Sequence, residues 1–160
     1  MIKVHEHTVE VVKRNDPLSS LLTESTLLRH LERYARRPHE YFEPMESSEV
    51  TEGFENNQHV LRRILHFGRM TVADKVTFVD NKTMVTDIDQ TDDYPASRLT
   101  IKIETSAEQV LSLHFIYEED SDTPPADDIF LSLRRKAYEE KDRDMVERFK
   151  QQAQDLSELS

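Results

Sequence analysis

The segment LRRILHFGRMTVADKVTF, residues 61–78, has the period-two alternation of two β-strands that meet at Gly68, one of the 2 glycines in the chain. A two-residue type II′ turn requires a positive φ angle at its first central position, which glycine adopts at little steric cost. With Gly68 and Arg69 as the central residues of such a turn, the segment predicts a β-hairpin.

This turn determines which residues face each other across the hairpin. On one face it pairs apolar residues and also one arginine with one aspartate: Phe67 with Met70, Leu65 with Val72, Arg63 with Asp74, and Leu61 with Val76. On the other face it pairs His66 with Thr71, Ile64 with Ala73, and Arg62 with Lys75. The first face is the buried one, because the second is too mixed to exclude water.

An unpaired charge on the buried face would be costly, whereas a hydrogen-bonded pair can be tolerated. Two interpretations of Arg63 and Asp74 follow. They form a cross-strand salt bridge near the edge of the sheet, or Arg63 lines a cavity and binds a carboxylate, carbonyl or phenolate of a ligand.

The rest of the chain predicts one α+β domain over residues 1–160. Residues 2–13 are predicted to form a first strand. Apolar residues at helical spacing predict a helix over 23–37, with Thr23 or Ser25 as its N-cap and Pro38 as its stop, and a short helical turn at 39–42. Alternating segments then predict six further strands, at 47–54, 59–67, 70–79, 83–89, 97–105 and 110–119. Each has one polar and one apolar face, as in an antiparallel meander with one covered face.

A long amphipathic helix is expected over about 126–156, with Thr123 as a possible cap. Its apolar side is predicted to pack on the sheet through Ile129, Phe130, Leu133, Ala137, Tyr138, Met145, Phe149, Ala153 and Leu156.

The composition excludes several classes of function. A net charge of −11 repels nucleic acid phosphates and anionic lipid surfaces, and we interpret the basic cluster Arg29, Arg33, Arg36 and Arg37 as a solvated helix face. The absence of cysteine excludes disulfides and thiolate chemistry. No apolar segment approaches the ~20 residues of a membrane span. We therefore expect a cytoplasmic protein that binds neither nucleic acid nor membrane.

No catalytic motif stands out. His5 and His7 share one strand face, but nothing in the sequence places a third ligand, so we expect no metal and no cofactor. There is no phosphate-binding glycine loop and no dinucleotide fingerprint. Tyr117 on an inner strand face and Tyr138 on the inner helix face have hydroxyls that could reach a cavity.

The order of strand, short helices, six-strand meander and long helix resembles the helix-grip fold of the START, or SRPBCC, superfamily, which includes the birch-pollen-type allergens. The stretches RNDP, LLRHLERYARRPHEYF, VLRRILHFGRMTVADKVTFV, SRLTIKI and HFIYEED are similar to the AtaL-like branch. The resemblance implies a seven-stranded curved antiparallel sheet around the C-terminal helix, and a cavity between them.

Relatives in the superfamily use that cavity to bind lipids, sterols, polyketides or hormones, and some cyclise polyketides. The resemblance thus favours a binding protein for a small, largely apolar molecule over an enzyme. A polyketide cyclase or aromatase that would use Asp74 as its base, or an oligomeric interaction module such as a homodimer, remain alternatives. The expected cavity lining is Leu61, Arg63, Leu65, Asp74, Val76, Phe78, Ile101, Phe115, Tyr117 and Tyr138.

Overall fold

The computed structural model describes residues 1–158. In chain order its elements are β1 (Ile2–Val12), the 3₁₀ helix η1 (Pro17–Ser20), α1 (Glu24–Arg36), the 3₁₀ helix η2 (Pro38–Glu40), β2 (Ser47–Glu55), β3 (Gln58–Phe67), β4 (Met70–Asp80), β5 (Thr83–Ile88), β6 (Ser97–Thr105), β7 (Leu111–Glu119) and α2 (Ile129–Glu158).

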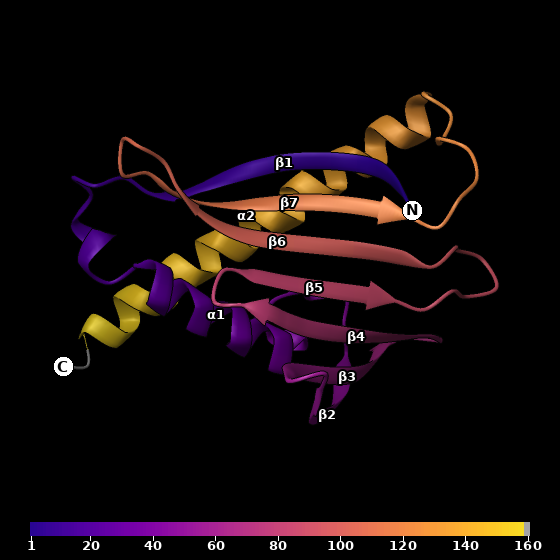
Figure 1. The fold of residues 1–160 in the computed structure, drawn as a ribbon, viewed down its shortest axis with the longest axis horizontal. Coiled ribbons are helices and arrows are strands. Elements are labelled where there is room, and N and C mark those ends of the chain that lie inside the picture. The colour runs from indigo at the N-terminus through magenta and orange to yellow at the C-terminus, as the bar shows by residue number, and fades with distance from the viewer. Residues whose placement is uncertain (159–160) are drawn as a thin grey trace.

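The seven strands form one sheet in the order β1-β7-β6-β5-β4-β3-β2, and every neighbouring pair is antiparallel (Figure 1). From β2 to β7 the strands follow one another as a meander, and β1 adds to the free edge of β7. The predicted helix-grip architecture, a curved antiparallel sheet with a long C-terminal helix, is confirmed.

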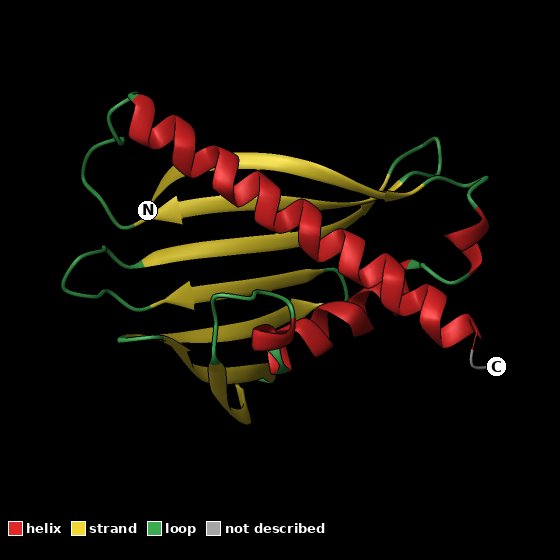
Figure 2. Cartoon of the chain, turned by 180° about the vertical axis from the view of Figure 1, so that it is seen from behind, coloured by secondary structure: helices red, strands yellow, loops and turns green. Residues whose placement is uncertain are grey.

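Both helices cover the same face of the sheet. Figure 2 shows α2 running diagonally across this face, with α1 beside its C-terminal half. The buried core lies between the sheet and the two helices. Its largest fully buried side chains include Leu27, Leu31, Leu61, Met84, Ile101, Leu113, Phe115 and Phe149. The apolar stripe of each strand is therefore covered, as the alternation requires.

The hairpin of β3 and β4 has the predicted register. Phe67 faces Met70, Arg63 faces Asp74 and Leu61 faces Val76. Gly68 has φ of +59°, while Arg69 has no positive φ, as the first and second central positions of a type II′ turn require. One glycine thus sets the register of the hairpin.

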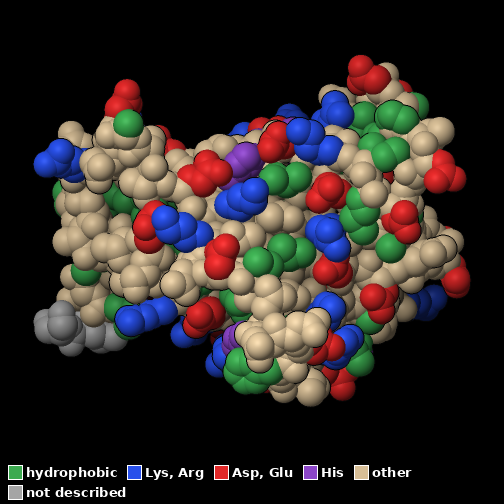
Figure 3. Space-filling view, viewed as in Figure 1, with side chains coloured by type: hydrophobic (Ala, Val, Ile, Leu, Met, Phe, Trp, Pro, Cys, Tyr) green, Lys and Arg blue, Asp and Glu red, His purple; other side chains and the backbone are tan. Residues whose placement is uncertain are grey.

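The opposite face of the sheet is polar. Figure 3 shows acidic and basic side chains interleaved over it. His114 on β7 lies 2.9 Å from Glu104 and 2.7 Å from Glu6, and Arg98 on β6 bonds Asp87 at 2.7 Å. These exposed cross-strand pairs keep this face solvated, and each contributes little stability on its own.

The first turns of α2 differ from the prediction. The helix begins at Ile129, and its first turn is capped by Asp128, whose Oδ1 accepts a hydrogen bond from the Leu131 backbone N–H at 3.1 Å. Five residues predicted to face the sheet are exposed instead: Ile129, Phe130, Leu133, Ala137 and Leu156. In the first turns the buried residue is Leu131, so the covered side of α2 differs there from the predicted one. Both ends of α2 also project beyond the sheet (Figure 2).

We predict that Gly68→Ala lowers the free energy of unfolding by about 1 kcal/mol, because alanine is strained at a positive φ. Steric clash adds nothing, since the nearest atom to an added Cβ is the Glu46 carboxylate at 3.8 Å. Gly53→Ala is the matched control: its Cβ would meet nothing within 4 Å and its φ is not positive. Urea denaturation of both variants measures the difference, and equal stabilities would contradict the assigned turn.

Candidate functional site

The Arg63 guanidinium is fully engaged inside the protein. Its Nε and Nη2 donate to the two carboxylate oxygens of Asp74 at 2.8 and 2.7 Å, and its Nη1 donates to the Ala35 carbonyl at 3.0 Å. Both side chains are buried. The pair therefore joins β3, β4 and the C-terminal turn of α1. It forms the cross-strand salt bridge that was the first of the two interpretations.

The remaining predicted lining residues divide into two groups. Four of them, Leu61, Val76, Ile101 and Phe115, are fully buried in the core between sheet and helices. Leu65 is also buried, and Phe78 packs on the edge of the core. For these six residues, and for Arg63 and Asp74, contact with a ligand stays a prediction.

Tyr117 and Tyr138 line a cavity of about 130 Å³ between the sheet and the first half of α2. Their rings stack in parallel, with centroids 4.0 Å apart and planes 8° from each other. The rest of the lining comes from β1, β5, β6, β7 and α2, namely Val4, Ile88, Ser97, Arg98, Leu99, Glu118, Glu119, Arg134 and Lys141. Two residues far apart in the sequence thus form one aromatic surface at the junction of sheet and helix.

A buried carboxylate lies behind this cavity. The Tyr117 hydroxyl donates to Asp142 Oδ2 at 2.7 Å, and His7 Nε2 lies 2.7 Å from the same oxygen. Asp142 is 1% exposed, so burying its charge depends on these bonds and on Lys141 Nζ, 3.8 Å from its other oxygen. The network fixes the hydroxyl and ring of Tyr117 relative to α2.

Asp142 was not predicted from the sequence as a site residue. The signal was present, since Asp142 is four residues after Tyr138 and three before Met145, on the apolar stripe of α2. An acidic residue on such a stripe is the same kind of interruption as Arg63 and Asp74 in the hairpin. His7 was expected on a strand face, and the structure places it on the covered one, where its ring stacks on Phe115.

Cationic side chains surround the tyrosine pair. Lys141 Nζ lies 5.3 Å from the centroid of the Tyr117 ring, and the Arg134 Nε donates to the Tyr138 hydroxyl at 2.8 Å. Arg134 also forms an ion pair with Glu119. The cavity therefore combines an aromatic surface with positive charges, which suits an aromatic molecule that carries electronegative substituents.

Burial changes the ionisation of two groups here. Burial and the adjacent Asp142 carboxylate raise the pKa of Tyr117 far above its usual range, so its hydroxyl keeps its proton at all physiological pH values. Burial also lowers the pKa of His5, partly offset by Glu139 nearby. Tyr117 thus serves as a hydrogen-bonding group and not as an acid.

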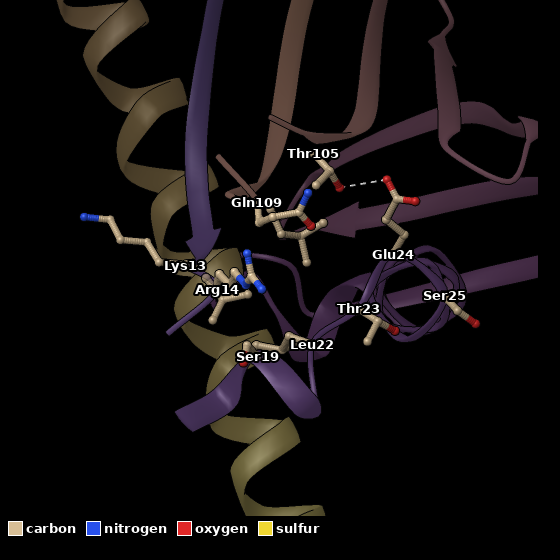
Figure 4. A pocket seen from close by; sticks show the side chains of 11 residues that line it. Lys13, Arg14, Ser19, Leu22, Thr23, Glu24, Ser25, Thr105 and Gln109 are labelled. Atoms are coloured by element: carbon tan, nitrogen blue, oxygen red, sulfur yellow. Dashed lines mark hydrogen bonds between the residues drawn. The ribbon is translucent and has the colours of Figure 1, made fainter. Parts of the chain in front are cut away.

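A larger cavity of about 560 Å³ lies at the opposite end of the same strands (Figure 4). It is open, and its walls come from the end of β1, from η1 and from the start of α1. The Thr105 hydroxyl donates to Glu24 at 2.8 Å across one side of it. Its lining carries the charged residues Lys13, Arg14 and Glu24 and presents no aromatic surface, so it suits a flat apolar molecule less well than the tyrosine cavity does.

Neither metal binding nor membrane crossing has structural support within residues 1–158. No group of three or more His, Asp and Glu side chains in this range is arranged to hold a metal ion. None of the described helices has both the length and the apolar character needed to cross a bilayer.

Residues 6–155 match the family model AtaL, described as Acetylaranotin biosynthesis cluster protein L. The chain belongs to the AtaL family. No functionally curated protein shows significant similarity to it. The match covers most of β1, all of β2 to β7 and nearly all of α2, so family membership and the helix-grip fold rest on the same residues.

Several solved structures share the fold of this AtaL family member. The di-domain ARO/CYC StfQ from the steffimycin biosynthetic pathway has a TM-score of 0.65 at 10% identity, over 98% of this chain and 52% of that one. The chain thus spans about half the length of that protein. A START superfamily protein from Mycobacterium smegmatis has a TM-score of 0.60 at 13% identity, over 92% of this chain and 97% of that one.

The Zhui aromatase/cyclase from Streptomyces sp. R1128 has a TM-score of 0.56 at 13% identity, over 94% of this chain and 92% of that one. At these identities the likeness concerns the fold. This fold is the helix-grip fold that the sequence predicts.

We predict that Asp74→Asn lowers the free energy of unfolding by about 3–5 kcal/mol, because it leaves the buried Arg63 guanidinium without a compensating charge. Asp87→Asn is the matched control, since it removes the same charge from the exposed Arg98 pair and is expected to cost at most about 1 kcal/mol. Urea denaturation compares the two. A double variant Arg63→Met with Asp74→Leu recovers most of the loss if the charge is responsible, and an equally small effect of both single variants would contradict the prediction.

Proposed function

We propose that the chain binds a small, largely apolar molecule, such as a lipid, polyketide or aromatic metabolite, in the cavity between the sheet and α2. The observation that carries the proposal is the stacked pair of Tyr117 and Tyr138 at this junction. Flat aromatic rings provide a large apolar contact area, and offset or parallel stacking orients a flat ligand.

The ligand is expected to carry an oxygen substituent. Arg134 and Lys141 line the cavity beside the tyrosines and would attract a phenolate, carbonyl or carboxylate. Burial of the apolar part at roughly 25 cal/mol per Å² would supply most of the affinity, and these cations would fix the orientation.

The size of the cavity sets a further condition. Its volume of about 130 Å³ is below the ~300–1,000 Å³ typical of sites for drug-sized ligands. A ligand of the proposed class therefore enters only if Tyr138 or its half of α2 shifts away from the sheet. Tyr138 is only partly buried and lies on the part of α2 that precedes the core residues Met145, Val146 and Phe149, so this movement leaves the core in place.

Binding has more support than catalysis at this cavity. Tyr117 keeps its proton because burial and Asp142 raise its pKa, and Asp142 itself does not belong to the cavity lining. Asp74, the base of the enzymatic alternative, has both oxygens bonded to Arg63. None of these three groups is free to exchange a proton with a ligand.

The test is a variant that fills the cavity. Ser97 lies on the covered face of β6 and lines the cavity, so Ser97→Phe places a large side chain where the ligand would bind. Ser112→Phe makes the same change on the outward face of β7. A panel of hydroxylated naphthalenes and anthraquinones is screened by thermal shift, with native mass spectrometry of the purified protein.

A binding compound at about 100 times its dissociation constant is expected to raise the melting temperature by roughly 5–10 °C. Ser97→Phe should abolish the shift and Ser112→Phe should keep it. The proposal fails if no compound binds and no ligand copurifies, or if both variants bind equally well.

One observation favours a second candidate function, acid–base catalysis on a polyketide-like substrate. His7 and Asp142 form a buried pair at 2.7 Å, in which a carboxylate orients an imidazole as it does for a general base. The ARO/CYC protein StfQ and the Zhui aromatase/cyclase share the fold. A linear poly-β-carbonyl substrate would have to reach His7 past the tyrosine pair.

For this second candidate, we expect the wild-type protein to accelerate cyclisation of a linear tetraketide analogue. Chromatography of the products measures the rate. His7→Gln should then reduce the rate by about 10²–10⁴-fold, because the base is lost. Binding of the analogue should persist in this variant. A rate that the wild-type protein does not raise above the uncatalysed one excludes this candidate and leaves the binding function standing.

A further inference from the structure

A groove separates α1 from the last turns of α2, outside the sheet–helix cavity. Four residues of α1 line it at spacings of three and four, Thr26, Arg29, His30 and Arg33, and three residues of α2 do so at the same spacings, Ala153, Leu156 and Ser157. Leu21, which precedes α1, completes the lining. Each helix thus presents one continuous stripe to the groove.

The groove has the size and the walls of a small-molecule site. Its volume is about 410 Å³, within the ~300–1,000 Å³ typical of such sites. Ala153 is buried at its floor, and Leu156 is 63% exposed at its wall, where an apolar ligand would cover it. His30 stacks on Phe149, and burial lowers its pKa, so it contributes a neutral ring.

The rim of the groove is positively charged although the protein carries a net charge of −11. Within residues 1–158, Arg29 forms no ion pair. The one ion pair of Arg33 in that range is with Glu40, at 3.4 Å. These two arginines are four residues apart and repel each other along one helix edge. Glu32, the acidic residue between them, acts on Arg36 and does not line the groove. An anion beside Arg29 and Arg33 would relieve this repulsion.

We propose that this groove binds an anionic amphiphile, a molecule with an apolar body and one carboxylate or sulfonate group. The apolar body lies on Leu21, Ala153 and Leu156, and the anionic group lies between the guanidinium groups of Arg29 and Arg33. This site is separate from the tyrosine cavity and does not depend on the function proposed for it.

The test uses two fluorescent probes that differ only in the charged group. 8-Anilinonaphthalene-1-sulfonate carries a sulfonate, and N-phenyl-1-naphthylamine is the same ring system without it. We expect the wild-type protein to bind the sulfonate probe at least tenfold more tightly. Arg29→Gln with Arg33→Gln should remove this preference, and Leu156→Gln should weaken the binding of both probes.

Arg69→Gln with Arg148→Gln is the matched control, because it removes the same charge from two exposed arginines that form no ion pair with residues 1–158. This control should retain the tenfold preference. If the preference for the sulfonate probe is lost in both double variants, it arises from net charge and the proposal is overturned. A preference that survives Arg29→Gln with Arg33→Gln but is lost in Ser97→Phe would place the probe in the tyrosine cavity, and would overturn this proposal while supporting the other.

Discussion

One buried guanidinium connects the covering layer to the sheet. Arg63 bonds Asp74 across the β3–β4 hairpin and the Ala35 carbonyl at the end of α1, so three segments meet at a single side chain. A carbonyl near a helix C-terminus lacks an intrahelical partner and carries partial negative charge, which a cation stabilises. The residues of α1 that line the groove with α2 lie on another face of that helix from its buried residues.

The second buried charge acts in a different way. Asp142 lies on α2 and bonds Tyr117 on β7 and His7 on β1. It therefore fixes α2 near one edge of the sheet, whereas Arg63 lies on β3, near the other edge. The two ionic centres thus hold α1 and α2 separately. The tyrosine cavity lies next to the second centre, where Tyr117 is held by the buried Asp142 and the partly buried Tyr138 is held by Arg134 of its own helix. This difference in constraint is what would let the cavity admit a ligand.

Much of the fold could be predicted because its signals are local. Gly68 and the alternation on both sides of it determined the register of β3 and β4, and Thr23 and Pro38 marked the limits of α1. The site was harder to predict. Tyr117 and Tyr138 were recognised as inward-facing, but Asp142 was missed, because a single acidic residue on a helix stripe is noticed only when its partners are known. Ile129, Phe130 and Leu133 were assigned to the core, since periodicity does not tell where the sheet beneath a helix ends.

The sequence by itself determined the strands, their register in the hairpin, the limits of α1 and the opposition of Arg63 to Asp74. These properties depend on neighbours in the chain and on turn geometry. Only the tertiary structure decided that the Arg63 guanidinium bonds Asp74 and the Ala35 carbonyl. It also decided that His7 and Tyr117 contact Asp142, and that α1 and α2 form a basic groove between them. Those contacts join residues from separate elements, and their distances depend on how the helices cross the sheet, which no local pattern specifies.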